Sequence, residues 1–109
     1  MSAKPTDIKL LQKSRRLEIQ FDDGQKFSLS CEYLRVHSPS AEVRGHGKKI
    51  LQIGKQDVNI IGIDPVGNYA IRLVFDDGHN SGIYSWETLY DLSVNQEKYW
   101  QTYLEEVAA

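Results

Sequence analysis

The sequence feature that most constrains the fold is an internal repeat. Residues 21–24 and 75–78 both read Phe-Asp-Asp-Gly, at an offset of 54, and alternating apolar and polar residues flank each copy. Asp-Gly between alternating segments is typical of a β-hairpin turn, because glycine accepts the positive φ that these turns need. The sequence therefore predicts one hairpin in each half of the chain.

A helix start follows each predicted hairpin. Ser30 and Ser85 each precede a glutamate by two residues. A serine hydroxyl caps the unpaired N–H groups of a first helical turn, and a carboxylate there meets the positive end of the helix dipole. Pro39 ends the first helix, because the residue before a proline disfavours helical geometry. Each unit is thus predicted to be a hairpin followed by a short helix.

The remaining elements complete a strand-rich α+β domain. We expect strands at residues 50–53 and 58–63, a turn at 64–68, and a C-terminal helix after Asn95 as its cap. Two repeats are fewer than a solenoid needs, so we expect them to pack in one core. The prediction is a single domain over residues 1–109, with its core at about 8–104. The apolar stripe of the C-terminal helix is formed by Tyr99, Trp100, Tyr103, Leu104 and Val107.

Composition narrows the function classes. The chain has one cysteine, no apolar stretch near the roughly 18 residues of a membrane span and a polar N-terminus, so we expect a cytoplasmic protein without disulfides. The net charge of −2 argues against coating nucleic acid. Residues 1–55 hold 11 basic and 6 acidic residues, net +5, whereas residues 56–109 hold 2 and 9, net −7. The halves either pair across one domain or present a basic patch to an anionic partner.

A few residues are candidates for chemistry. Cys31 has His37 six residues away, but its repeat counterpart is Trp86, so we expect a buried, inert thiol rather than a nucleophile. His79 departs from the repeat and either bonds to turn backbone or contacts a ligand or partner. Residues 45–49, from Gly45 to Lys49, lack the pattern of a nucleotide-binding loop. They are either a solvated loop or a site for a small anion.

Longer motifs then suggest a family. The segments at 33–35, 37–43, 45–47 and 76–86 together resemble the N-terminal-like domain of gamma-butyrobetaine hydroxylase, whose small stand-alone bacterial members form a family of unknown function. The resemblance runs from about Ile8 to Tyr103 and implies a compact α+β domain. The separate catalytic domain of the hydroxylases, which uses iron and 2-oxoglutarate, has no counterpart here. We therefore expect no enzymatic activity.

The resemblance also implies a zinc ion, bound by a Cys-x-Cys-x-x-Cys loop and a later histidine. Aligned on the aromatic-Leu-Arg stretch, those positions fall on Ser38, Ser40, Val43 and His79. Two serines and a valine cannot replace three thiolates, so we expect no cofactor. The family domain is also similar to one appended to P-loop iron–sulfur cluster carriers, which implies a link to iron–sulfur or iron-enzyme pathways.

These observations lead to two main hypotheses for the function, and to an enzyme as a third. The first is an interaction module that contacts an unidentified protein partner; the expected contact residues are Arg35, His37, His46, His79 and Trp86. The second is a metal-binding protein, for zinc or iron, in which His79 is joined by His37, His46 or Cys31. An enzyme would need a pocket beside one of the histidines.

Overall fold

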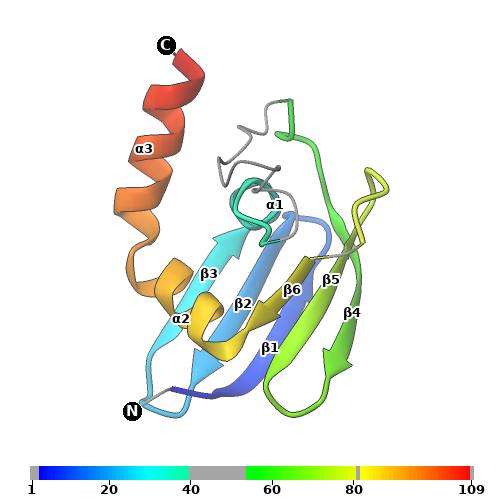
Figure 1. Ribbon diagram of the computed structural model, residues 1–109, viewed down its shortest axis with the longest axis vertical. Helices are drawn as coiled ribbons and strands as arrows, with labels where there is room; N and C mark the ends of the chain where they lie inside the picture. The colour runs from blue at the N-terminus through cyan, green and yellow to red at the C-terminus, as the bar shows by residue number, and fades with distance from the viewer. Residues whose placement is uncertain (1–2, 40–53, 81, 109) are drawn as a thin grey trace, which may run out of the picture.

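The computed structural model describes residues 3–39, 54–80 and 82–108 (Figure 1). These residues form two units of the same order, three strands followed by a helix, and one further helix. The first unit comprises β1 (Pro5–Leu11), β2 (Arg16–Phe21), β3 (Lys26–Ser30) and α1 (Cys31–Val36). The second comprises β4 (Ile60–Val66), β5 (Ala70–Phe75), β6 (Gly82–Ser85) and α2 (Trp86–Val94), and α3 (Gln96–Ala108) ends the chain.

The predicted α+β class, repeat and C-terminal helix are confirmed. Each unit is an antiparallel sheet, in the orders β1-β2-β3 and β4-β5-β6, and the Asp-Asp-Gly turns join the last two strands of each. Each sheet has one strand more than a hairpin. Sequence reasoning missed β1 because an edge strand bonds on one side only, and most of its side chains are half-buried or exposed. The strand expected at residues 50–53 lies outside the described residues.

The fourth strand is longer than expected. It was predicted to end at Ile63 before a turn, but Asp64 and Pro65 continue the ladder, with Pro65 opposite Ile71 of β5. A proline is tolerated because β4 lies at the edge of its sheet in the described structure and needs no N–H bond on that side. The chain reverses at Gly67 instead, where φ is 56°.

Both predicted helix caps are present. The Ser30 hydroxyl accepts a hydrogen bond from the Tyr33 N–H at 3.0 Å, and Ser85 does the same for Thr88 at 3.1 Å. The two repeats therefore share the same helix-capping hydrogen bond as well as the same sequence pattern.

The two sheets share one core. Buried side chains of β2, β3, β5 and β6 meet those of α1 and α2. Two buried tyrosines add hydrogen bonds between these elements, one from α1 to α2 and one from β6 to α1. The Tyr33 hydroxyl donates to the Leu92 carbonyl at 2.7 Å, and the Tyr84 hydroxyl donates to the Leu34 carbonyl at 2.6 Å. The largest fully buried side chains include Tyr33, Tyr84, Phe21, Phe75, Leu17, Ile19, Leu29, Leu34, Ile60 and Leu73.

Helix α3 lies along one side of the molecule, and its last turns extend past the strands (Figure 1). It begins after Asn95, as predicted, because the Asn95 carbonyl accepts the Tyr99 N–H at 2.9 Å. Only Tyr103 of its apolar stripe is buried, while Leu104 and Val107 are 43% and 40% exposed. Much of the stripe therefore faces outward. Within the described ranges, no helix has both the length and the apolar character to cross a bilayer.

Candidate functional site

Two predicted contact residues, Arg35 and His79, meet at Asp77 in the β5–β6 turn. Arg35, in the last turn of α1, donates from Nε to Asp77 Oδ2 at 2.8 Å, and Lys55 Nζ donates to the same oxygen at 2.9 Å. The backbone N–H of His79 donates to Asp77 Oδ1 at 3.1 Å. Partial burial raises the pKa of Asp77, but these three hydrogen bonds outweigh it and lower the pKa to about 2.

The ring of His79 reaches the end of α1. Its Nε2 lies 2.7 Å from Ser38 Oγ, and Ser38 is fully buried. Burial, followed by the charge of Arg35, lowers the pKa of His79 below 6.5, so the imidazole is neutral at neutral pH. The ring of His79 thus joins two segments 41 residues apart. Its bond to turn backbone is made by its own carbonyl, which accepts the Phe75 N–H at 2.9 Å.

The other predicted residues lie elsewhere. His37 Nδ1 donates to the Tyr33 carbonyl at 2.9 Å, and its ring stacks on Tyr99 of α3. Trp86 starts α2, directly after the last residue of β6, whereas His79 precedes β6. The Trp86 indole N–H donates to the Asn68 carbonyl at 2.8 Å. Among the described contact residues, Trp86 is therefore separated from His79 by the length of β6. His46 and the expected anion site at residues 45–49 lie outside the described residues.

Cys31 is a buried thiol, as expected. It opens α1, has no exposed surface, and its Sγ lies 3.7 Å from Asn59 Oδ1. Burial raises the pKa of the thiol, which disfavours the nucleophilic thiolate. Cys31 and His37 are at opposite ends of α1, so they form no nucleophile–base pair.

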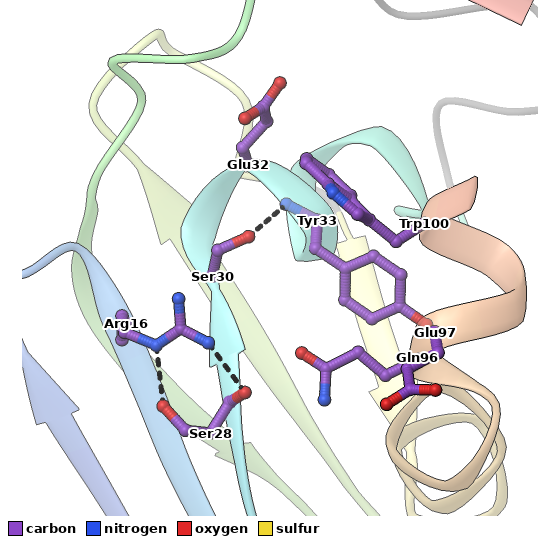
Figure 2. A pocket seen from close by; sticks show the side chains of 8 residues that line it. All are labelled: Arg16, Ser28, Ser30, Glu32, Tyr33, Gln96, Glu97 and Trp100. Carbon is purple, nitrogen blue, oxygen red and sulfur yellow. Dashed lines mark hydrogen bonds between the residues drawn. The ribbon is translucent and has the colours of Figure 1, made fainter. Parts of the chain in front are cut away.

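A groove that sequence reasoning missed lies between α3 and the first sheet. It has a volume of about 490 Å³, and Figure 2 shows the Trp100 ring beside Tyr33, with Arg16 on the strand side. Two nitrogens of Arg16 bond to Ser28, from Nε to Oγ at 2.7 Å and from Nη2 to the carbonyl at 2.9 Å. The full lining is Arg16, Ser28, Ser30, Glu32, Tyr33, Gln96, Glu97 and Trp100. We call it the Trp100 groove.

A second groove of about 410 Å³ lies on the other flank of α3. It contains His37 and Tyr99, and the Tyr99 hydroxyl lies 3.0 Å from both carboxylate oxygens of Asp91. Both grooves depend on where α3 packs, which the repeat does not predict.

Comparison with known proteins places the chain in a family. A model of the family described as gamma-butyrobetaine hydroxylase-like, N-terminal, matches residues 8–90. The chain belongs to this family. The match confirms the resemblance seen in the sequence, although it ends before α3. A search of curated proteins finds no match.

Solved structures support the assignment to the gamma-butyrobetaine hydroxylase-like N-terminal family. One solution NMR structure is 59% identical with a TM-score of 0.86, covering 98% of this chain and 81% of that one. A second is 43% identical with a TM-score of 0.88, covering 100% and 87%. A crystal structure of a DUF971-family protein of unknown function from Acidithiobacillus ferrooxidans is 40% identical with a TM-score of 0.70, covering 82% and 91%.

The zinc ion that the family resemblance implies does not fit the residues present. Of its four ligand positions, Ser38 and His79 are described, and they bond to each other through a hydroxyl and a neutral imidazole. Within the described ranges, no three His, Cys, Asp or Glu side chains gather as a metal site would require. The chain's one cysteine is buried at the far end of α1. A closed tetrahedral zinc site needs four thiolates or imidazoles, and of the four residues at these positions only His79 carries such a group.

Proposed function

We propose that the protein is a non-enzymatic interaction module that binds a short segment of a partner protein in the Trp100 groove. The observation that carries this proposal is the Trp100 ring, which is half-buried on the wall of an open groove. Tryptophan is enriched among the residues that contribute most to binding, because a large ring buries much area at little entropic cost.

The apolar surface continues beyond the groove. Leu104 and Val107 follow Trp100 by four and seven residues, so the three share one face of α3. Both side chains are partly exposed. A row of apolar side chains that leads out of a groove suits an extended or helical segment better than a small molecule.

Charge indicates what that segment carries. Glu32 and Glu97 line the groove with Arg16, and two nitrogens of Arg16 are already bonded to Ser28. A lysine or arginine in the groove would meet the carboxylate of Glu97 and the face of the Trp100 ring. We therefore propose an apolar segment with at least one basic residue as the occupant.

Site-specific photocrosslinking in cells of the source organism tests this proposal. Gln96 lines the groove and Gln101 lies on another face of α3, so replacing each with p-benzoylphenylalanine gives a matched pair. We expect a discrete partner adduct from position 96 and none from position 101. Equal adducts from both positions, or none from either, would show that the groove is not the interface.

A charge reversal tests the chemistry of the segment. Glu97 lines the groove, whereas Glu105 is an exposed glutamate of the same helix that lines neither groove. Glu97→Lys should abolish the adduct from position 96, and Glu105→Lys should leave it unchanged. An adduct that survives Glu97→Lys would contradict the basic residue in the occupant.

The finer expectations remain predictions. These are partner contacts at Arg35, His37, His46, His79 and Trp86, a cytoplasmic location and a link to iron–sulfur or iron-enzyme pathways. The alternative of zinc or iron binding through His79 with His37, His46 or Cys31 is a weaker proposal. The hydrogen bond between His79 and Ser38 and the burial of Cys31 both count against it.

A further inference from the structure

Arg35 is buried with much of its hydrogen-bonding capacity unused. The residue is 6% exposed, and Nε is its one guanidinium nitrogen with a hydrogen bond in the described part of the chain. Nη1 is buried and has no hydrogen-bond partner among the described residues. The outer edge of a guanidinium, formed by its two Nη atoms, is the edge that binds carboxylate and phosphate groups in a bidentate manner. In Arg35 this edge is unoccupied among the described residues.

The local charge is also unbalanced. Arg35 and Lys55 share one carboxylate oxygen of Asp77. Among the residues that the structure describes, two cations against one anion leave a surplus positive charge at a largely buried position. Such a charge is costly unless an anion or further hydrogen bonds compensate it.

The surroundings supply polar groups and a route of access. Gly82 lies against Ser38 Oγ and His79 Nε2, where any larger residue would collide. The side chains of Lys55 and Asp77 are about one-fifth exposed, at 23% and 21%, so solvent reaches the cluster from their side. Lys55 has a flexible stem, and its ammonium can leave Asp77 for another anion while Arg35 keeps its Nε bond.

We propose that a small oxyanion, a carboxylate or phosphate group, binds the outer edge of the Arg35 guanidinium and the ammonium of Lys55. This site lies at the β5–β6 turn, and Arg35 and Lys55 line neither of the two grooves beside α3. The anion proposal is therefore independent of the proposed partner segment. The bound anion would balance the surplus charge and satisfy the buried Nη1.

Titration with inorganic phosphate and with acetate tests the site. Both are added to ¹⁵N-labelled protein in Tris buffer, with chloride holding the ionic strength constant, while the Arg35 Nε–H and His79 amide signals are followed by NMR. We expect saturable shifts of both signals with at least one anion. Saturation by acetate alone indicates a carboxylate ligand, and saturation by phosphate alone indicates a phosphate. Linear shifts, or no shifts, with both anions would overturn the proposal.

Two variants locate the binding. Lys55→Met removes one proposed ligand from a partly exposed position and should weaken binding at least about tenfold, as expected for a lost charge-assisted hydrogen bond. Arg72→Met is the matched control, because Arg72 is an exposed cation paired with Asp64 on the outer face of the second sheet. It should bind as the parent does. Equal affinities in the parent and in Lys55→Met would overturn the proposal.

Discussion

The Ser38 hydroxyl and the His79 imidazole, 41 residues apart, lie 2.7 Å from each other and join the end of α1 to the β5–β6 turn. By the family resemblance, both occupy zinc-ligand positions. The chain therefore brings these two positions together, as a metal site would require, but position 38 carries a serine hydroxyl, which is a poor zinc ligand. A hydrogen bond now links the segments that a metal ion would otherwise link.

The first prediction concerns metal content. Protein purified without a histidine tag should contain less than about a tenth of an equivalent of zinc, because hydroxyls do not replace thiolates. A variant combining Ser38→Cys, Ser40→Cys and Val43→Cys should gain about one equivalent by elemental analysis. Stoichiometric zinc in the parent, or none in the triple variant, would contradict this interpretation of the substituted positions.

The second prediction concerns pH and His79. Burial and the charge of Arg35 lower its pKa in the folded protein, so the unfolded chain binds the proton more readily. The stability that the neutral ring contributes is complete above about pH 6.5 and is lost as the pH falls below it. Urea unfolding at pH 7.5 and pH 5.5 should show a larger loss for the parent than for His79→Gln. Equal losses would show that His79 is not responsible.

The third prediction concerns Asp77, whose pKa lies at about 2. Its ionised form stabilises the fold above the unfolded value of about 4, and this contribution is lost as the pH falls from about 4 toward 2. Lys55→Met removes one hydrogen bond to the carboxylate and should raise the pKa of Asp77. Carboxyl ¹³C NMR titration measures both values. An unchanged titration midpoint of Asp77 in the variant would show that Lys55 does not stabilise the ionised carboxylate of Asp77.

Much of the fold follows from local patterns. The Asp-Asp-Gly turns and the serine caps each depend on residues within a few positions, and both predicted caps accept the expected bonds. The pattern does not reveal strand β1, because an edge strand can be half-polar. It also predicts that β4 ends at Ile63, because a proline is typical of a turn, whereas the ladder continues through Pro65. Both errors depend on which strand lies at a sheet edge, and this is a property of the assembled sheet.

The site was harder to predict than the fold. His79 was identified because it interrupts the repeat, and Arg35 because it belongs to a motif. Neither signal shows that Asp77 joins them, because the contact between Arg35 and Asp77 spans 42 residues. The Trp100 groove was missed because its walls come from four elements, β2, β3, α1 and α3. A helical stripe such as Trp100 to Val107 indicates an apolar face, but not how much of that face the rest of the molecule covers.

The fourth prediction concerns the tyrosine that joins α1 to α2. The Tyr33 hydroxyl is buried and donates to the Leu92 carbonyl at 2.7 Å. Tyr33→Phe leaves that carbonyl without its donor and should lower the free energy of unfolding by about 1–2 kcal/mol. Tyr69→Phe is the control, because Tyr69 is 58% exposed, and it should change stability by less than about 0.5 kcal/mol. Equal effects in urea unfolding would contradict a structural role for this bond.

The fifth prediction concerns the glycine beside the Ser38–His79 pair. A Cβ at Gly82 would collide with Ser38 Oγ and lie 3.2 Å from the Tyr84 ring. Because Ser38 is buried and bonded, it cannot move aside at no cost, so Gly82→Ala should lower the free energy of unfolding by about 1–3 kcal/mol. Gly62→Ala is the matched control in the same sheet, since its Cβ would meet only Val74 at an ordinary 3.5 Å. If Gly82→Ala is as stable as Gly62→Ala, the contact between α1 and the β5–β6 turn is looser than the hydrogen bond indicates. In that case the His79 amide should also exchange rapidly with solvent, which hydrogen-exchange NMR on the parent protein measures independently.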